Sequence, residues 1–107
     1  MLICTADAID GRKVKTCLGL VRGSAIRTRH LFTDITEWLR NLVGAELHHY
    51  TKMLGECREQ ALDRLKEHAR QLGADAVVAV RFETSSIAGG AAEILVYGTA
   101  VVLEPAD

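Results

Sequence analysis

Three cysteines and four histidines are the side chains of this sequence that are best suited to hold a soft metal ion. Zinc and softer cations take about four thiolate or imidazole ligands, which usually arrive as close pairs such as Cys-x-x-Cys. The sequence contains no such pair. Cys4 and Cys17 could face each other from neighbouring strands, whereas His48 and His49 fall in a predicted extended link, where adjacent side chains point in opposite directions. One chain alone therefore predicts no dedicated metal site, although ligands from several subunits could converge on an axis.

Each of these side chains also has a simple structural interpretation. Cys57 lies on the apolar stripe of a predicted helix, where a free cysteine behaves as a small buried hydrophobe. We expect the same of Cys4 and Cys17 in the sheet. His68 stands among charged helix residues and is expected to be solvated, and His30 belongs to a polar approach to a helix.

Positive charge is most concentrated between residues 22 and 30, just before a predicted helix. The free N–H groups of a helix N-terminus attract negative charge, so this segment could bind an anion or a small anionic ligand. The alternative is that these side chains pair with acidic residues of a neighbouring subunit or stay solvated, as surface charges commonly do. The residues concerned are Arg22, Arg27, Arg29 and His30.

Catalytic motifs are missing from the sequence. There is no Gly-x-Ser-x-Gly, no His-Glu-x-x-His, and no lysine or helix after Gly89-Gly90 that would make a phosphate-binding loop. The Tyr50 hydroxyl is better explained by one polar contact at an interface than by catalysis. The carboxylates form the hydrophilic side of a helix, namely Glu56, Glu59, Asp63 and Glu67. We therefore expect no enzyme, no catalytic residue and no cofactor.

Composition limits the partners. The 107 residues are 49% hydrophobic and 25% charged, with 13 Lys and Arg against 14 Asp and Glu, so that the net charge is -1. This balance is typical of one globular domain, here residues 1–107, and it favours neither nucleic acid nor an anionic membrane. No apolar run of about 18 residues could span a bilayer. The start does not resemble a signal peptide and the cysteine count is odd, which together favour a reducing cytoplasm.

The hydrophobic pattern predicts a mostly antiparallel sheet with two helices on one face, in an α+β fold. Gly19 and Gly23, within the second strand, indicate a bulge, a bend or a close backbone approach. Gly73 is expected to end the second helix. In chain order, the predicted elements are strands at 2–5 and 14–26, helices at 34–44 and 50–72, and strands at 76–82 and 92–103.

The last predicted strand is apolar on both faces. Ile94 and Val96 fall on one face, whereas Leu95, Tyr97 and Val101 fall on the other. Two helices can cover only one face of a four-stranded sheet, so the second face requires another cover. Neighbouring copies of the chain are the expected source, and the sequence therefore predicts a homo-oligomer.

Several segments together resemble the YbjQ-like family of small bacterial and archaeal proteins, which is often labelled heavy-metal-binding. They are Gly19-Leu20-Val21-Arg22-Gly23, Val43-Gly44, Tyr50 with Arg58 and Ala61, Gly73-Ala74-Asp75-Ala76-Val77-Val78 and Tyr97-Gly98-Thr99-Ala100-Val101. The family usually has two glycines after the first helix, where this chain has Gly44-Ala45. The resemblance implies a subunit like those of dodecins, assembled into a ring that is commonly a pentamer. It implies no particular activity.

These observations favour a cytoplasmic, non-catalytic homo-oligomer that acts as a binding or scaffold protein of unknown ligand. The alternative is a protein that binds or sequesters heavy metals, as the family label suggests. A metal-binding protein would take up a soft cation in a fixed ratio to the protein chain, whereas an anion-binding protein would not.

Overall fold

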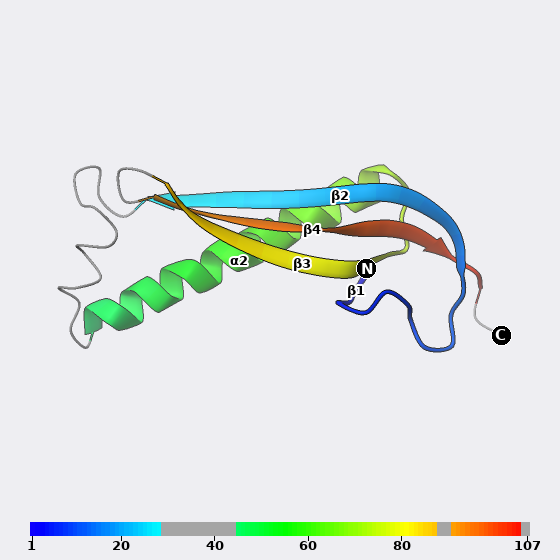
Figure 1. Ribbon diagram of the computed structural model, residues 1–107, viewed down its shortest axis with the longest axis horizontal. Helices are drawn as coiled ribbons and strands as arrows, with labels where there is room; N and C mark the ends of the chain where they lie inside the picture. The colour runs from blue at the N-terminus through cyan, green and yellow to red at the C-terminus, as the bar shows by residue number, and fades with distance from the viewer. Residues whose placement is uncertain (29–44, 88–90, 106–107) are drawn as a thin grey trace.

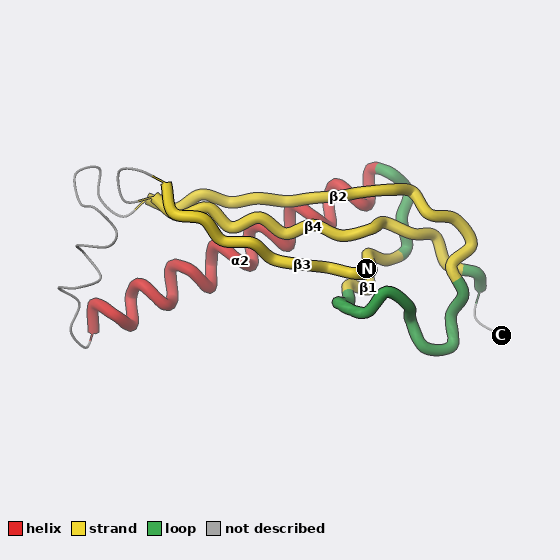
Figure 2. The backbone as a smooth tube through the Cα atoms, viewed as in Figure 1, coloured by secondary structure: helices red, strands yellow, loops and turns green. Residues whose placement is uncertain are grey.

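Four strands and one helix make up the fold in a computed structural model that describes residues 1–28, 45–87 and 91–105. The strands form one sheet in the order β1-β3-β4-β2, in which β1 is parallel to β3 and the other pairs are antiparallel. Helix α2 runs obliquely across one face of this sheet (Figures 1 and 2). The elements are β1 Leu2–Ile3, β2 Val14–Thr28, α2 Ala45–Gln71, β3 Ala76–Ile87 and β4 Ala91–Leu103.

Helix α2 faces the sheet with side chains four residues apart. Cys57, Ala61, Leu65 and Ala69 are each 0% exposed. This spacing keeps them on one side of a helix with 3.6 residues per turn. The helix lies mainly over β2 and β4, and of the three long strands it contacts β3 least. Because three of these four side chains are small, the helix can approach the sheet closely.

The end of α2 is a Schellman motif. Gly73 has a φ of 81°, a left-handed conformation that glycine adopts without steric cost. The Gly73 N–H donates to the Arg70 carbonyl at 2.9 Å, and the Ala74 N–H donates to the Ala69 carbonyl at 3.0 Å. The prediction that Gly73 ends the helix is confirmed.

Gly23 marks the closest approach between helix and sheet. A Cβ atom there would overlap the Ala61 carbonyl oxygen and the Leu65 nitrogen. Gly19 has a φ of 107°, and the pairing of β2 with β4 shifts between Cys17 and Gly19. Both glycines therefore serve backbone geometry, as the sequence predicted: one permits a bulge and the other a close approach.

The opposite face of the sheet is covered at one end by the chain's own N-terminal segment. Cys4 and Ile9 pack there against buried side chains of β3 and β4. The Cys4 N–H donates to the Val77 carbonyl at 3.0 Å, and the Ala79 N–H donates to the Ala6 carbonyl at 2.8 Å. The second cover that the last strand requires is thus intramolecular at this end. The buried side chains are Ala76, Val78, Val101 and Leu103.

A bulge at Ala79 interrupts the alternation of faces along β3. Regular alternation would place Val78 and Val80 on the same face, but Val80 belongs to the cluster under α2 and Val78 to the cluster on the other face. Ala79 has a φ of 54°, and the pairing of β3 with β4 shifts between Val78 and Arg81. One extra residue on a strand reverses the face of every residue that follows it.

The α+β prediction is confirmed for one helix and a four-stranded, mostly antiparallel sheet. The predicted helix at 34–44 falls on residues 29–44, which lie outside the described part of the chain. Helix α2 begins at Ala45 rather than Tyr50, so the prediction of an extended link containing His48 and His49 is wrong. Strand β3 continues to Ile87, five residues past the predicted end at Phe82. Within the described residues, no helix combines the length and apolarity needed to cross a membrane.

The elements are long for a chain of this size. Strands β2, β3 and β4 have 15, 12 and 13 residues, whereas strands of about 5 to 6 residues are commonest. The chain extends 55 × 23 × 16 Å with a radius of gyration of 17.2 Å. A compact chain of this length has a radius of gyration of about 13 Å. Among the described residues, apolar side chains of the sheet such as Leu20 and Ile26 are more than half exposed.

Candidate functional site

The cysteines do not come together. Cys4 follows β1 and Cys17 lies in β2, and these strands are the two opposite edges of the sheet. At about 4.8 Å per spacing, three strand spacings place the backbones of these two edge strands roughly 14 Å apart. The hypothesis that the two cysteines face each other from neighbouring strands is therefore wrong. Cys17 is exposed, contrary to prediction, and Cys4 is half-buried.

The prediction of a buried Cys57 is confirmed. Its side chain is 0% exposed, and its thiol donates to the Ala25 carbonyl at 3.3 Å. A thiol that is engaged with backbone inside the core is not placed to bind a metal from solution. Among the described residues, no group of three or more His, Cys, Asp or Glu side chains is arranged to hold a metal ion. The described residues of one chain therefore do not offer a ligand set that fits a heavy-metal site.

His68 is a structural side chain rather than a solvated one. It is half-buried, and its Nδ1 lies 3.2 Å from the Arg22 backbone nitrogen and 3.4 Å from the Arg22 carbonyl oxygen. Arg64 donates a hydrogen bond to the Ser24 carbonyl. Two side chains of α2 thus occupy backbone groups of the edge strand β2. Occupied edge groups cannot pair with another strand, which protects this edge from aggregation.

The predicted anion site is only partly described. Arg22 is exposed and lies in β2 on the sheet face that α2 does not cover. The side chains of Arg27, Arg29 and His30 lie outside the described residues, as does that of Tyr50. The clustering of positive charge ahead of a helix therefore stays a prediction.

The open sheet face, defined here as the face of β2, β3 and β4 opposite α2, carries exposed apolar side chains. Leu20 is 69% exposed and Ile26 is 51% exposed, whereas Leu95 and Tyr97 of the central strand β4 are half-buried. The register aligns these residues in rows across the three strands. One row is Leu20, Thr99 and Val78, and the next is Arg22, Tyr97 and Arg81.

The row through Tyr97 combines one aromatic ring with two guanidinium groups. Arg22 and Arg81 are exposed on either side of the half-buried Tyr97. Arg81 donates to the carbonyls of Thr5 and Val80 at 2.8 Å, which fixes it beside the N-terminal segment. Sequence reasoning missed this row. Alternation placed Tyr97 correctly, but only the register shows which arginines flank it.

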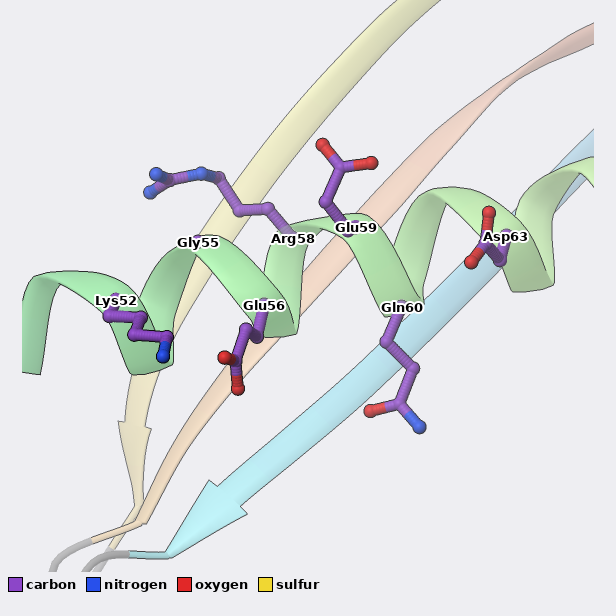
Figure 3. A pocket seen from close by; sticks show the side chains of 7 residues that line it. All are labelled: Lys52, Gly55, Glu56, Arg58, Glu59, Gln60 and Asp63. Carbon is purple, nitrogen blue, oxygen red and sulfur yellow. The ribbon is translucent and has the colours of Figure 1, made fainter. Parts of the chain in front are cut away.

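A shallow, open groove of about 680 Å³ lies along the outer side of α2. Figure 3 shows its side chains fanning out from the helix, with the strands behind it. Three carboxylates and two cationic side chains line the groove, which gives its lining a net charge of -1. The lining residues are Lys52, Gly55, Glu56, Arg58, Glu59, Gln60 and Asp63.

Gln60 is the unusual member of this groove. Its Oε1 is buried, and it has no hydrogen-bond partner within the part of the chain that the structure describes. A buried acceptor without a donor costs roughly 1 to 3 kcal/mol. No signal in the sequence pointed to this, because Gln60 stands among charged residues of a helix surface.

The fold and these surfaces define a class of protein: a slender α+β fold whose glycines set backbone geometry and whose described residues include no group of three or more His, Cys, Asp or Glu side chains that could hold a metal ion. This chain belongs to the YbjQ family, whose model matches residues 1–104 and is described as "Putative heavy-metal-binding".

Similar proteins occur in bacteria and archaea. A UPF0145 protein of Thermus thermophilus is 55% identical over 106 residues, which cover 99% of this chain and 93% of the relative. A UPF0145 protein of Methanosarcina acetivorans is 54% identical over 101 residues, covering 94% and 95% of the two chains. A crystal structure of a DUF74 family protein of unknown function from Pediococcus pentosaceus aligns with a TM-score of 0.65 at 18% identity, covering 97% of this chain and 98% of that one. This last likeness supports the fold alone.

Proposed function

We propose that the chain is a non-catalytic, self-assembling protein of the cytoplasm that acts as a binding or scaffold subunit. The observation that carries this proposal is the open sheet face, where Leu20 and Ile26 are more than half exposed beside Leu95 and Tyr97. Apolar side chains that gather on one face of a small domain mark an association surface. The long, thin shape supports the same conclusion, because self-association covers what the single chain leaves open.

Light scattering after size exclusion tests the assembly. At micromolar concentration, we expect a closed multimer whose mass is unchanged on tenfold dilution, and five subunits is the number that the family resemblance implies. Replacing Leu20 and Ile26 together by glutamate should reduce the mass to that of one chain, because charges are costly to bury in an interface. The matched control is Lys15→Glu, a charge change at an exposed position of the same strand, which should leave the mass unchanged. A wild-type chain that is a folded monomer would contradict the proposal.

Heavy-metal binding is the alternative function, and the description of the matching family model is what favours it. The separation of Cys4 and Cys17 argues against a site within one chain. We expect the reduced protein to retain well below one cadmium ion per subunit after dialysis. The reason is that the sequence contains no close pair of cysteine or histidine ligands, which would reduce the entropic cost of ordering a metal site. The measurement is elemental analysis of the dialysed protein. Stoichiometric retention that is lost in the Cys4→Ser/Cys17→Ser variant would instead support a metal site formed between subunits.

A further inference from the structure

The N-terminal segment from Cys4 to Ile9, called the strap here, covers one end of the open sheet face. The side chains of Cys4 and Ile9 are half-buried, whereas residues 5–8 between them are exposed. The strap therefore shields apolar side chains of the sheet while it buries little of itself. The shielded side chains are Ala76, Val78, Val101 and Leu103.

The bulge in β3 receives the strap. Ala79 and Val80 have no paired position on β4 in the register of the two strands. Their N–H groups donate to the strap instead, Ala79 to the Ala6 carbonyl at 2.8 Å and Val80 to the Cys4 carbonyl at 3.1 Å. Ala79 has a φ of 54°, a left-handed conformation that is unfavourable for alanine. The strained residue of the strand is thus the one that holds the middle of the strap.

Arg81 adds a side-chain contact next to the bulge. Its Nη1 donates to the Thr5 carbonyl and to the Val80 carbonyl, both at 2.8 Å, so that one nitrogen joins the strap to β3. A hydrogen bond from a charged donor is roughly twice as strong as a neutral one. In the described part of the chain, the hydrogen bonds between strap and sheet fall on residues 4–6, whereas Ile9 is held by apolar packing.

These contacts are few compared with those of the core. Ordering the backbone of one residue costs a free energy similar to that which one hydrogen bond returns, so a short segment with two half-buried side chains is only marginally stable. Under α2, by contrast, Cys57 and Leu65 are 0% exposed. Segments with few buried contacts open at a lower free energy than the whole fold.

We propose that the strap opens and closes as a unit while the rest of the fold stays intact, and that Arg81 is its latch. In the row of Leu20, Thr99 and Val78, Leu20 is 69% exposed, but Val78 beside the strap is 5% exposed. Opening therefore extends the exposed apolar surface from Leu20 across β4 to Val78, and it frees the Cys4 thiol. The strap sets how much of the open sheet face the chain presents. This inference does not depend on self-assembly, because the strap and its binding site belong to one chain.

Alkylation of two cysteines in one molecule tests the opening. In a Cys17→Ser chain, Cys4 reports on the strap and the buried Cys57 reports on global unfolding. Mass spectrometry follows both reactions with N-ethylmaleimide, and each rate is divided by that of the same cysteine in urea-unfolded protein. We expect Cys4 to react at least about 100-fold faster than Cys57, as for a segment that opens locally. Equal corrected rates would overturn the inference, because the strap would then leave the sheet only when the whole chain unfolds.

A core variant separates local opening from global unfolding. Leu65→Ala should raise the Cys57 rate at least about 30-fold, the low end of the cost of truncating a buried leucine expressed as a rate. The same variant should leave the Cys4 rate unchanged, since Leu65 stays packed when only the strap opens. If the Cys4 rate rises by the same factor as the Cys57 rate, the strap has no opening of its own.

Arg81→Ala tests the latch in the same Cys17→Ser chain. Loss of the charge-assisted bond to Thr5 should raise the Cys4 rate about 10-fold. The matched control is Arg22→Ala, which removes the other arginine of the row, on β2 at the far side of Tyr97, and should leave the Cys4 rate unchanged. A Cys4 rate that does not respond to Arg81→Ala would show that the thiol reacts without any opening of the strap, and the proposal would fail.

Discussion

Gly23→Ala should lower the free energy of unfolding by about 3 kcal/mol, the upper end of the range of about 1 to 3 kcal/mol that overpacking typically costs, because the overlapping atoms are rigid. The added Cβ would overlap the Ala61 carbonyl oxygen and the Leu65 nitrogen, which are backbone atoms of α2. A side chain could turn away from such a contact, but a helix backbone must move as a unit. The whole helix would have to lift from the sheet, and the side chains that it buries would lose contacts.

Urea unfolding at a fixed protein concentration measures this change, since the proposed assembly would make the apparent stability depend on concentration. The matched control is Ser24→Ala, at the adjacent position of the same strand. Ser24 contributes its backbone carbonyl to Arg64, and that contact does not need the serine side chain. We expect the control to change stability by less than about 0.5 kcal/mol, as surface substitutions usually do. If Gly23→Ala costs no more than the control, α2 does not approach β2 as closely as the structure places it.

The sequence motifs that suggested the family are explained by folding rather than by chemistry. Gly23 permits the approach of α2, Gly19 adopts the left-handed backbone of a bulge, and Gly73 closes the helix. Asp75 accepts the Leu103 N–H through Oδ2 at 3.0 Å, which ties the start of β3 to the end of β4. These four motif positions therefore specify the fold of the chain.

Local periodicity was sufficient to predict the helix stripe and the faces of β4. Cys57 is buried on the apolar stripe of the helix as predicted, together with Ala61 and Leu65. Ile94 and Val96 share one face as alternation indicated, and the structure shows that this face lies under α2. Periodicity did not predict the faces of β3 beyond Ala79. The bulge there adds one residue to the strand, and an alanine gives no sign of a bulge in the sequence. Periodicity also failed at the start of α2, where His48 and His49 are compatible with a helix as well as with a link.

The candidate sites were harder to predict than the elements. Whether Cys4 meets Cys17 depends on the order of strands in the sheet, and the pairing of Tyr97 with Arg22 and Arg81 depends on register. Both are long-range properties that follow from packing between segments far apart in the chain. Likewise, the unpaired Gln60 oxygen is a consequence of burial on the folded helix. The sequence could place each residue on a face, but it could not say which faces meet.

Leu65→Ala should destabilise the chain by about 2 to 5 kcal/mol, the range for buried leucines. Leu65 is 0% exposed and is among the largest fully buried side chains of the described residues. It lies at the centre of the α2 stripe, against a sheet face that includes Val21, Val77 and Val96. Truncation would leave a cavity that cannot close by collapse, because the Gly23 backbone already touches the helix at this level. The expected cost therefore falls in the upper half of the range.

The measurement is again urea unfolding at the concentration used for the wild type, with Leu72→Ala as the matched control. Leu72 directly follows α2 and is 44% exposed, so the same truncation should cost less than about 1 kcal/mol there. An unchanged m-value in both variants would show that the difference arises in the native core rather than in the unfolded ensemble. Equal effects of the two truncations would mean that Leu65 is not in the core, and that α2 does not cover the sheet through the stripe that contains it.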